Sequence, residues 1–558
     1  MSMLFSLSAN AATDYYAQIQ ATRADVDALT GKNATPAQLK EGVARLQKSL
    51  RELRQPDVEA LAVGSQALYF RGHDVRIDLA KLYVRLNMKE EALDMLEAAQ
   101  RFAWIPEALQ PLAGDAAFAG LSDTPRFKQI LRNGDIAARL AQGPASTVPY
   151  QETLSVEQRI AGLTQFWAEA RANFAYFDHV PDLDWNQVYL EFLPKVMAAT
   201  STRGYYRVLM QLAPLLQDGH TNIYPPKELQ DEFFARPPLV AAMVESRVLV
   251  ERIDSPTLAQ RIRVGDEIIA IDGVQVQRYA EDRIRPFVSS STPQDRMLRM
   301  YSYQLLAGDA RIPVTLTLRD AAGKERQETL ARSGYLDVRP PAPFAFRMLP
   351  GGVAYIALDH FESDAGVKAF EQALPEILKA KALVIDVRRN GGGASEYGWE
   401  VLSYLSRTPI AYAPQYVRTD QPLQRARGSK ILIWQPVDNA GARAFSHPHP
   451  QIFDGKVAVL TGAGTFSAGE DFIVAFNTLK RGVTIGETTG GSTGQPLTMP
   501  LPGGGTARIC IKRDLTPEGR DFVGIGLPPD IVLPPTVASL RSGTDPVLER
   551  ALLALTQP

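Results

Sequence analysis

Residues 457–472 carry the strongest signal of fold class in this 558-residue chain and have the sequence Val457-Ala458-Val459-Leu460-Thr461-Gly462-Ala463-Gly464-Thr465-Phe466-Ser467-Ala468-Gly469-Glu470-Asp471-Phe472. Its first five residues predict a buried strand, the glycines that follow predict a turn, and a helix is expected from about Ser467. One apolar stripe runs along that helix, formed by Ala468, Phe472, Ala475, Phe476 and Leu479. A serine therefore stands where a buried strand turns into a helix.

The same alternation of strand and helix extends to both sides of this stretch. Strands are predicted in GVAYIAL (352–358), ALVIDVRR (382–389), KVAVLTG (456–462) and VTIGET (483–488), with helical patterns after each of the first three. Continuous apolar runs of this length are typical of strands buried on both faces. We therefore predict a multidomain α/β protein whose α/β core spans residues 344–540, followed by a C-terminal helix over 541–558.

The part of the chain before this core is predicted to hold three further regions. Residues 13–142 have apolar residues at three-to-four spacing and predict a helical domain, which resembles tetratricopeptide repeats only in one unit. Residues 155–230 predict a helical subdomain that ends in Asp218-Gly219-His220. Residues 237–335 switch to short strands separated by polar turns.

Within that β-rich region, residues 264–273 (VGDEIIAIDG) resemble the most recognisable segment of PDZ domains. Such domains add an extended peptide as a strand at a sheet edge. The stretch RPPLVAAMV (236–244) has no glycine where a carboxylate-binding loop would lie. Capture of a free C-terminus is therefore not expected, and a regulatory role and a packing role both stay open.

Composition excludes several function classes. Sixty Lys and Arg residues against 62 Asp and Glu residues give a net charge of −2, so no overall field favours nucleic acid. The single cysteine, Cys510, excludes an intrachain disulfide and a Cys-rich zinc site. The histidines and acidic residues lack metal-ligand spacing, so neither a metal nor another cofactor is expected. No apolar run approaches the roughly 20 residues of a membrane span.

The N-terminal residues 1–12 receive two interpretations. A short apolar patch leads into Ala9-Asn10-Ala11, a small-x-small pattern that a signal peptidase could cleave. The patch is short and has no basic residue before it, so a disordered tail is the alternative. We expect export to the periplasm or the exterior, with a cytoplasmic location as the alternative.

Two interpretations also compete for Ser467. Ser467 and Glu470 form S-x-x-E, the pattern of a capping box, in which the serine satisfies free backbone N–H groups of the helix. In the functional interpretation the hydroxyl is a nucleophile, and the next backbone N–H faces a developing oxyanion. A second glycine-rich turn, Asn390-Gly391-Gly392-Gly393, follows a buried strand and can also direct N–H groups at an anion.

A serine nucleophile needs a base, and the chain offers six histidines: His73, His179, His220, His360, His447 and His449. His447 and His449 alternate with prolines and are predicted to be loop residues. His220 stands in an Asp-Gly turn, from which a side chain can project at a fixed point. From position alone, a solvated loop histidine remains the alternative for His220.

Four motifs then occur in a specific order: LVIDVRRNGGG (383–393), TGAGTFSAGEDF (461–472), VTIGETTGGSTGQP (483–496) and GIGLPPDI (524–531), preceded by LLQDGHTNI (215–223). Together they resemble the serine peptidase superfamily of C-terminal processing peptidases, the tricorn core protease and interphotoreceptor retinoid-binding protein. The resemblance covers about residues 155–558. It implies a crotonase/ClpP-like core of ββα units with a small helical subdomain in front.

The resemblance also implies roles for individual residues. Ser467 matches the family nucleophile, and the N–H groups of Ala468 and Gly392 match the oxyanion donors. C-terminal processing members use a lysine about 25 residues after the serine, where this chain has Ser492. The tricorn-like branch uses a histidine before the PDZ-like region, and His220 resembles it. We therefore expect a Ser467–His220 pair.

The third catalytic member is expected to be an acid that orients the histidine. Relatives often have a glutamate just before the Gly-x-Gly-x-Pro-Pro-Asp turn, where this chain has Val523. Glu470 is the candidate that replaces it, Asp521 and Glu518 are further candidates, and Asp218 is expected to shape its own turn.

These assignments predict a serine endopeptidase that cleaves peptides or unfolded proteins through an acyl-enzyme. A catalytically inactive member of the same fold, which binds a peptide or another ligand, is the alternative, since Val523 stands at the usual acid position. No motif indicates an oligomeric state.

Overall fold

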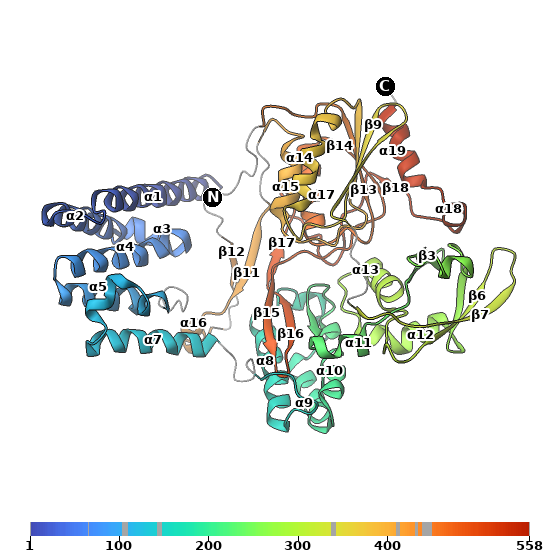
Figure 1. Cartoon of the computed structure of the whole chain (residues 1–558), viewed down its shortest axis with the longest axis horizontal. Helices are drawn as coiled ribbons and strands as arrows, with labels where there is room; N and C mark the ends of the chain where they lie inside the picture. Colours follow the sequence, from blue (N-terminus) through green and yellow to red (C-terminus); the bar gives the residue numbers. More distant parts are fainter. Residues whose placement is uncertain are drawn as a thin grey trace. The chain divides into compact units, whose positions relative to one another are not determined.

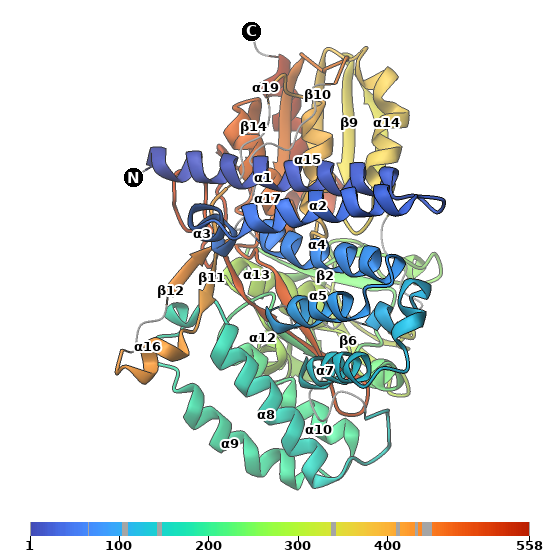
Figure 2. The same cartoon turned by 90° about the vertical axis from the view of Figure 1, so that its left-hand side faces the viewer.

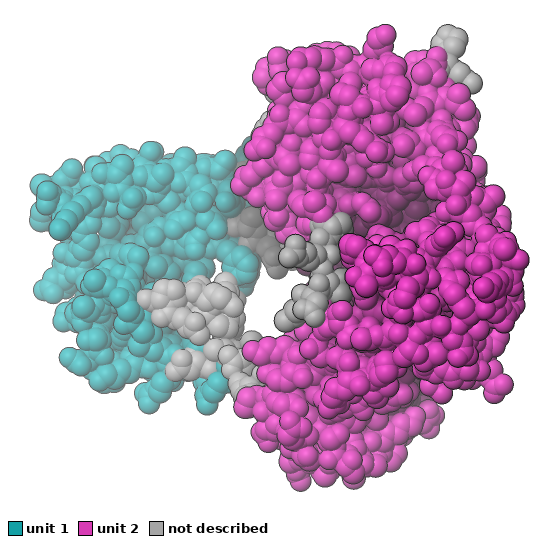
Figure 3. Space-filling model, turned by 45° about the vertical axis from the view of Figure 1, so that its right-hand side comes forward, with its two compact units in different colours: residues 1–144, 438–443 teal, residues 145–437, 444–558 magenta. Residues whose placement is uncertain are grey.

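A computed structural model of the chain describes residues 2–64, 66–102, 110–141, 148–335, 342–408, 413–429, 433–437 and 449–556 (Figure 1). The chain divides into two compact units, shown in different colours in Figure 3. Unit 1 comprises residues 1–144 and 438–443, and unit 2 comprises residues 145–437 and 444–558. The helices of the described part include none with the length and hydropathy that a membrane crossing requires.

Unit 1 is built from helices, as the three-to-four spacing of its apolar residues predicts. They are α1 (Ser2–Leu29), α2 (Pro36–Leu53), α3 (Pro56–Gly64), α4 (Gln66–Arg85), α5 (Lys89–Phe102) and α7 (Pro125–Ala141), and Figure 2 shows most of them stacked side by side. Leu46, Leu79, Ala80 and Leu96 are among the side chains that form its core. Residues 2–12 belong to α1, in keeping with their Met, Leu and Ala content.

The first part of unit 2 is a group of helices that leads to His220. It consists of α8 (Val156–Asn173), α9 (Trp185–Ala198) and α10 (Thr202–Leu209). Ser155 and Gln158 form a capping box at the start of α8, and Asp184 caps α9. A short 3-10 turn, Ala213–Leu216, follows, and Gln217 ends it in the left-handed conformation with φ 48°. The chain then enters the turn of Asp218, Gly219 and His220.

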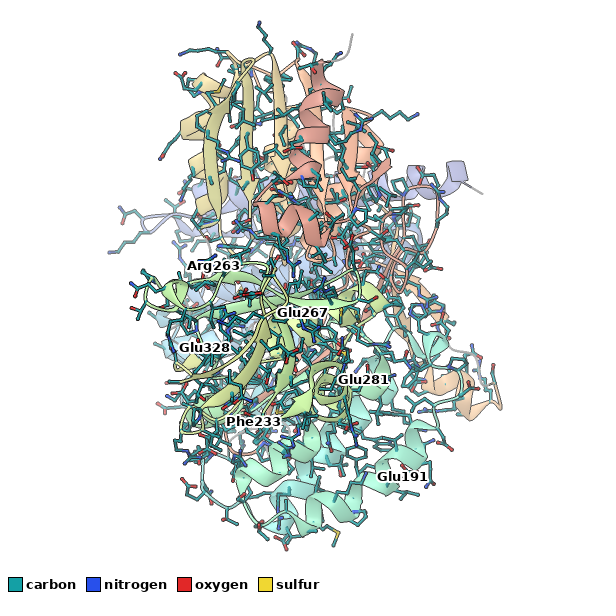
Figure 4. All side chains as sticks on the ribbon, turned by 90° about the vertical axis from the view of Figure 1, so that its right-hand side faces the viewer. Glu191, Phe233, Arg263, Glu267, Glu281 and Glu328 are labelled. Atoms are coloured by element: carbon teal, nitrogen blue, oxygen red, sulfur yellow. The ribbon has the colours of Figure 1, made fainter. Side chains whose placement is uncertain are left out.

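The β-rich region that follows forms one sheet, in the order β2-β3-β4-β6-β7 with β5 beside β4. The strands are β2 (Leu239–Val244), β3 (Arg247–Ile253), β4 (Glu267–Ile271), β5 (Val274–Gln275), β6 (Val314–Arg319) and β7 (Glu325–Leu330). Two helices, α12 (Val276–Arg283) and α13 (Pro293–Leu298), and a π-helix, Arg299–Gln304, accompany them. Glu267 and Glu328, labelled in Figure 4, pair with Arg247 and Arg261.

The core of unit 2 is a sheet in the order β18-β14-β13-β10-β9-β8. The first five strands run parallel to one another, and β8 is antiparallel to β9. The strands are β8 (Phe344–Leu349), β9 (Val353–Leu358), β10 (Ala382–Asp386), β13 (Lys456–Thr461), β14 (Gly482–Gly486) and β18 (Ile531–Val532). The strands predicted from the apolar runs are therefore β9, β10, β13 and β14.

Helices cover both faces of this sheet, which explains why its strands are apolar throughout. The helices α14 (Ala365–Ile377), α15 (Ser395–Ser403) and α17 (Ala468–Leu479) lie on one face, and α19 (Pro546–Thr556) lies on the other (Figure 1). Leu383 and Ile385 of β10 belong to the core cluster that contains α17, whereas Val384 packs into the cluster of α19. The alternation along β10 thus serves two separate apolar layers.

Two three-stranded sheets connect the helical part of unit 2 to this core. One has the order β1-β16-β15, with β1 (Asn222–Tyr224), β15 (Pro496–Leu501) and β16 (Gly505–Cys510). The other has the order β12-β11-β17, with β11 (Gln415–Thr419), β12 (Ile433–Pro436) and β17 (Lys512–Asp514). Short helices α11 (Gln230–Phe233), α16 (Pro422–Ala426) and α18 (Val537–Ser542) complete the unit. Because β1 begins two residues after His220, its pairing with β16 ties the histidine to the core.

Candidate active site

Ser467 occupies a strained turn between β13 and α17. Its backbone has φ 56° and ψ −125°, a region that residues other than glycine rarely adopt and that costs about 1–3 kcal/mol. Its side chain makes no capping hydrogen bond to the helix, so the capping box expected from S-x-x-E is wrong. The positive φ turns the hydroxyl away from the helix N–H groups, and Glu470 binds a different loop. The side chain of Ser467 remains partly exposed.

His220 lies directly beside Ser467, although 247 residues separate them in sequence. The distance from His220 Nε2 to Ser467 Oγ is 2.9 Å, within hydrogen-bonding range. Asp218 shapes the turn as expected: its Oδ1 accepts the backbone N–H of His220 at 3.0 Å and the Thr221 hydroxyl at 2.8 Å. The structure therefore brings together the two residues of the predicted pair.

Aromatic packing fixes the plane of the imidazole. The ring of Phe466 stacks on that of His220, with centroids 4.7 Å apart and an interplanar angle of 18°. The Arg299 guanidinium lies 4.8 Å from the Phe466 centroid and pairs with Asp295 at 2.6 Å. Burial lowers the pKa of His220 well below its usual value, and the nearby cations Arg508, Arg299 and Lys512 lower it further. A neutral imidazole can accept the proton of Ser467.

The other ring nitrogen of His220 contacts Ser492, a residue that we did not predict to be part of the site. His220 Nδ1 and Ser492 Oγ are 2.8 Å apart, and the Ser492 carbonyl accepts the Ser467 N–H at 3.0 Å. Sequence reasoning used Ser492 only as evidence that the lysine base is missing. Its position in the loop that carries that lysine in relatives was the signal that could have placed it at the site.

Glu470 lies behind Ser492 and does not bond His220. The carboxylate is fully buried and accepts three hydrogen bonds: from the Thr489 hydroxyl at 2.5 Å, the Gly491 N–H at 2.8 Å and the Ser492 N–H at 2.7 Å. Burial raises the pKa of Glu470 to about 8, against the opposing effect of these donors. Among the described residues no hydrogen bond joins Glu470 to His220, and both carboxylate oxygens bond the 489–492 loop instead. The expectation that Glu470 directly orients the histidine is therefore wrong.

The other two acid candidates lie outside the hydrogen-bond network of His220. The backbone of Asp521 forms an isolated β-bridge with that of Leu515, and the exposed carboxylate of Glu518 pairs with Arg520. Neither has a hydrogen bond to His220 among the described residues, so the expectation that one of them orients His220 is wrong. Val523, at the usual acid position, is buried in the apolar core.

The two predicted oxyanion donors differ in their present hydrogen bonds. Gly392 has φ 99°, and a Cβ added to it would lie 2.6 Å from the Ser467 Cβ, so its backbone approaches the nucleophile closely. Its N–H donates to Asn390 Oδ1 at 2.9 Å. The Ala468 N–H opens α17 and has no hydrogen-bond acceptor within the part of the chain that the structure describes.

The remaining candidates do not form a second site. Within the described ranges, the structure contains no cluster of three or more His, Cys, Asp or Glu side chains arranged for a metal. Cys510 is buried. His449 stacks on Tyr404 and bonds the Ser403 hydroxyl at 2.7 Å, so it is a packed residue rather than a solvated one. His447 lies outside the described residues.

Comparison with known proteins indicates the same group of peptidases as the order of the four sequence motifs. Residues 352–533 match the family model Peptidase family S41. The chain is 28% identical over 306 residues to "C-terminal processing peptidase, chloroplastic" of Tetradesmus obliquus, covering 52% of this chain and 57% of that protein. It is 24% identical over 296 residues to "Carboxyl-terminal-processing protease" of Synechocystis sp., covering 52% and 60%. The matched regions thus span less than two thirds of these relatives.

A solved structure supports the fold. The structure of mature CPAF complexed with lactacystin aligns with a TM-score of 0.55 and 17% sequence identity, over 69% of this chain and 95% of that chain. The chain therefore shares the mixed α/β fold of that structure. Residues 352–533 are thus similar to peptidase family S41, and the chain is similar in sequence to the C-terminal processing peptidases.

Proposed function

We propose that the chain is a serine endopeptidase in which Ser467 is the nucleophile and His220 the general base. The observation that carries this proposal is the 2.9 Å contact between His220 Nε2 and the hydroxyl of Ser467 at a strained strand-to-helix turn. Ser492 occupies the position of the family's lysine, and Lys480 lies at the opposite end of α17. The histidine is thus the base within reach of the hydroxyl.

The reaction follows from this geometry. His220 Nε2 takes the proton of the Ser467 hydroxyl while Oγ attacks the carbonyl carbon of the peptide bond. The resulting imidazolium gives that proton to the leaving amine, the C–N bond breaks, and an acyl-enzyme remains. A water molecule, deprotonated by the same nitrogen, then releases the acyl group and restores the Ser467 hydroxyl. The residues of this chain supply every proton transfer in this scheme.

The oxyanion hole is proposed to form from the Ala468 N–H, with the Gly392 N–H as its second donor. Ala468 follows the nucleophile, and its N–H lies at the positive end of α17. The Gly392 N–H becomes a donor to the oxyanion only when its bond to Asn390 Oδ1 opens or becomes shared. Because one such donor is worth about 3 kcal/mol, this exchange contributes to the activation barrier.

An inactive, ligand-binding member of the same fold is the second candidate. Two observations favour it: the Gly392 N–H is already bonded to Asn390, and no described carboxylate bonds the imidazole ring of His220. Under either candidate, we assign residues 237–335 to a PDZ-like domain and the core to the crotonase/ClpP type. We also propose that substrates are peptides or unfolded proteins and that the protein acts after export.

Digestion of a mixed peptide library by the full chain separates the two candidates. The wild type and a control, Ser542→Ala on the exposed end of α18, should cleave peptides, whereas Ser467→Ala and His220→Ala should not. Mass spectra of the products would locate each cleaved bond. Intact peptides after incubation with the folded wild type would favour the binding protein and contradict the peptidase.

A further inference from the structure

Ser492 touches three parts of the site at once: the imidazole of His220, the backbone of Ser467 and the carboxylate of Glu470. We propose that Ser492 is a positioning residue that holds the His220 imidazole through its hydroxyl, so that the site works as Ser467–His220–Ser492. Glu470 then anchors the loop that carries Ser492 instead of contacting the histidine. This inference rests on the proposed function, since it concerns the base of the same reaction.

The hydrogen bonds define the direction of the contact. If Nε2 is to accept the proton of Ser467, it must be unprotonated, and the ring proton must then reside on Nδ1. Nδ1–H donates to Ser492 Oγ, which lies 2.8 Å away. Ser492 thereby binds the ring proton of the tautomer that catalysis requires. It also sets how far the ring is rotated within its own plane. Stacking on Phe466 fixes the orientation of that plane but leaves this rotation free.

Ser492 is held rigidly enough for this task. Its side chain is fully buried, its N–H donates to Glu470 Oε2 at 2.7 Å, and its carbonyl accepts the Ser467 N–H at 3.0 Å. The preceding residues of the loop are fixed by Thr292, whose hydroxyl donates to the Gly490 carbonyl at 2.7 Å. The hydroxyl is therefore preorganised and loses little freedom when it binds the imidazole.

A hydroxyl differs from a carboxylate in what it does for the charged intermediate. A hydroxyl can accept a hydrogen bond from Nδ1–H or donate one to Nδ1, whereas a carboxylate can only accept, and the hydroxyl supplies no negative charge to stabilise the imidazolium. Three cations lie near the ring and oppose its protonation: Arg299, Arg508 and Lys512. The Asp218 carboxylate is also near, and it accepts the backbone N–H of His220 and so shapes the turn. The site consequently favours a neutral histidine over a wide pH range.

Substitution of Ser492 tests this role, with kcat, KM and the pH profile of peptide hydrolysis as readouts. Ser492→Ala should lower kcat by about 10-fold or more with KM nearly unchanged, since one hydrogen bond at the base is lost. Ser492→Thr retains the hydroxyl and should recover most of kcat. Ser492→Asp should move the acidic limb of the profile to higher pH, because a carboxylate on Nδ1 favours the imidazolium.

A matched control in the same loop is Thr493→Ala, which removes a hydroxyl that bonds Asp514 and not His220. Its pH profile should be that of the wild type. The imidazole Nδ1–H signal in the NMR spectrum, assigned by its loss in His220→Ala, should shift in Ser492→Ala and persist in Thr493→Ala. This NMR signal tests the positioning role of Ser492 even when an alanine variant has reduced stability.

The outcomes separate this inference from the proposed function. A wild type that cleaves no peptide contradicts the proposed function itself. An active wild type with Ser492→Ala equal to it in kcat, pH profile and Nδ1–H signal contradicts the positioning role alone. An unchanged acidic limb in a folded Ser492→Asp variant would also count against it.

Discussion

The ring of Phe466 lies nearly parallel to the imidazole of His220, with centroids 4.7 Å apart, and Phe466 is the residue immediately before the nucleophile. The turn that strains Ser467 therefore also supplies the surface on which its base rests. Cβ atoms added to Gly219 or Gly490 would lie within 3 Å of this ring, so the surrounding backbone is packed closely against it. One aromatic side chain thus couples the geometry of the two catalytic residues.

Replacement of Phe466 should therefore reduce catalysis without a change in either catalytic residue. A stacked aromatic pair is worth about 0.5–1.5 kcal/mol, so Phe466→Leu is expected to lower kcat by roughly 2- to 10-fold, and Phe466→Ala by more. Steady-state kinetics on a cleaved peptide would measure this. A value of kcat equal to that of the wild type in both variants would show that the stacking is not needed.

The glycine-rich turn 391–393 offers a sharper test because two neighbouring glycines differ in their surroundings. Gly392→Ala places a Cβ 2.6 Å from the Ser467 Cβ and 3.0 Å from the Phe466 carbonyl, at a φ of 99°. We expect it to lower kcat by at least about 100-fold, as for loss of an oxyanion donor. Gly391→Ala meets no atom within 4 Å and should stay near wild-type activity. Similar losses in both variants would count against a specific role for Gly392.

The low pKa of His220 predicts the acidic limb of the activity profile. The base form is the active one, and burial holds its pKa well below the usual value of about 6.5. Catalysis should therefore remain constant as the pH falls from 8 to 6.5 and decline only below that. Measurement of kcat/KM against pH on one peptide tests this. A decline that begins above pH 6.5 would mean that His220 carries a proton more readily than its surroundings imply.

Glu470 should make stability depend on pH in the opposite sense from an ordinary carboxylate. Its pKa is raised to about 8 in the folded protein, so the folded state holds a proton that the unfolded chain has released above about pH 4.5. The contribution of Glu470 to the free energy of unfolding is complete below pH 4.5 and is lost as the pH rises through 8. Asp218 and Asp471, whose pKa values are raised to about 6, make stability depend on pH in the same sense over a lower pH range.

The Tm of the wild type should therefore fall between pH 6 and pH 8 by more than that of Glu470→Gln, which cannot titrate. Thermal unfolding followed by circular dichroism at fixed ionic strength measures both. The carboxamide also places an N–H against the donors of Gly491 or Ser492, so the variant should be less stable than the wild type at pH 6. Parallel curves for the two proteins would contradict the raised pKa of Glu470.

The sequence alone was enough to predict the elements of the core and the meeting of two residues of the site. Apolar runs predicted β9, β10, β13 and β14, because strands buried on both faces must be apolar throughout. Local patterns left open a helix cap for Ser467 and a loop histidine for His220, and the pair was predicted from the resemblance of the ordered motifs to a peptidase family. Gly392 was predicted from the same resemblance, and its φ of 99° beside the nucleophile explains why a glycine stands there.

The partners of these residues were not predictable from local patterns. Ser492 meets His220 across 272 residues of sequence, and Arg299 reaches Phe466 from the π-helix Arg299–Gln304. Glu470 matched a capping motif, but the burial of its carboxylate among three donors directs it to the 489–492 loop instead. Such contacts depend on how distant segments pack, which short-range propensities do not encode.

The central claim is that His220 activates the hydroxyl of Ser467, and mass spectrometry of the full chain treated with a fluorophosphonate tests it most directly. The account predicts one covalent adduct on the wild type, located on the peptide that contains Ser467. It predicts no adduct on Ser467→Ala and at least a roughly 100-fold slower reaction of His220→Ala. A wild type without an adduct, or a His220→Ala variant that reacts as fast as the wild type, would contradict it.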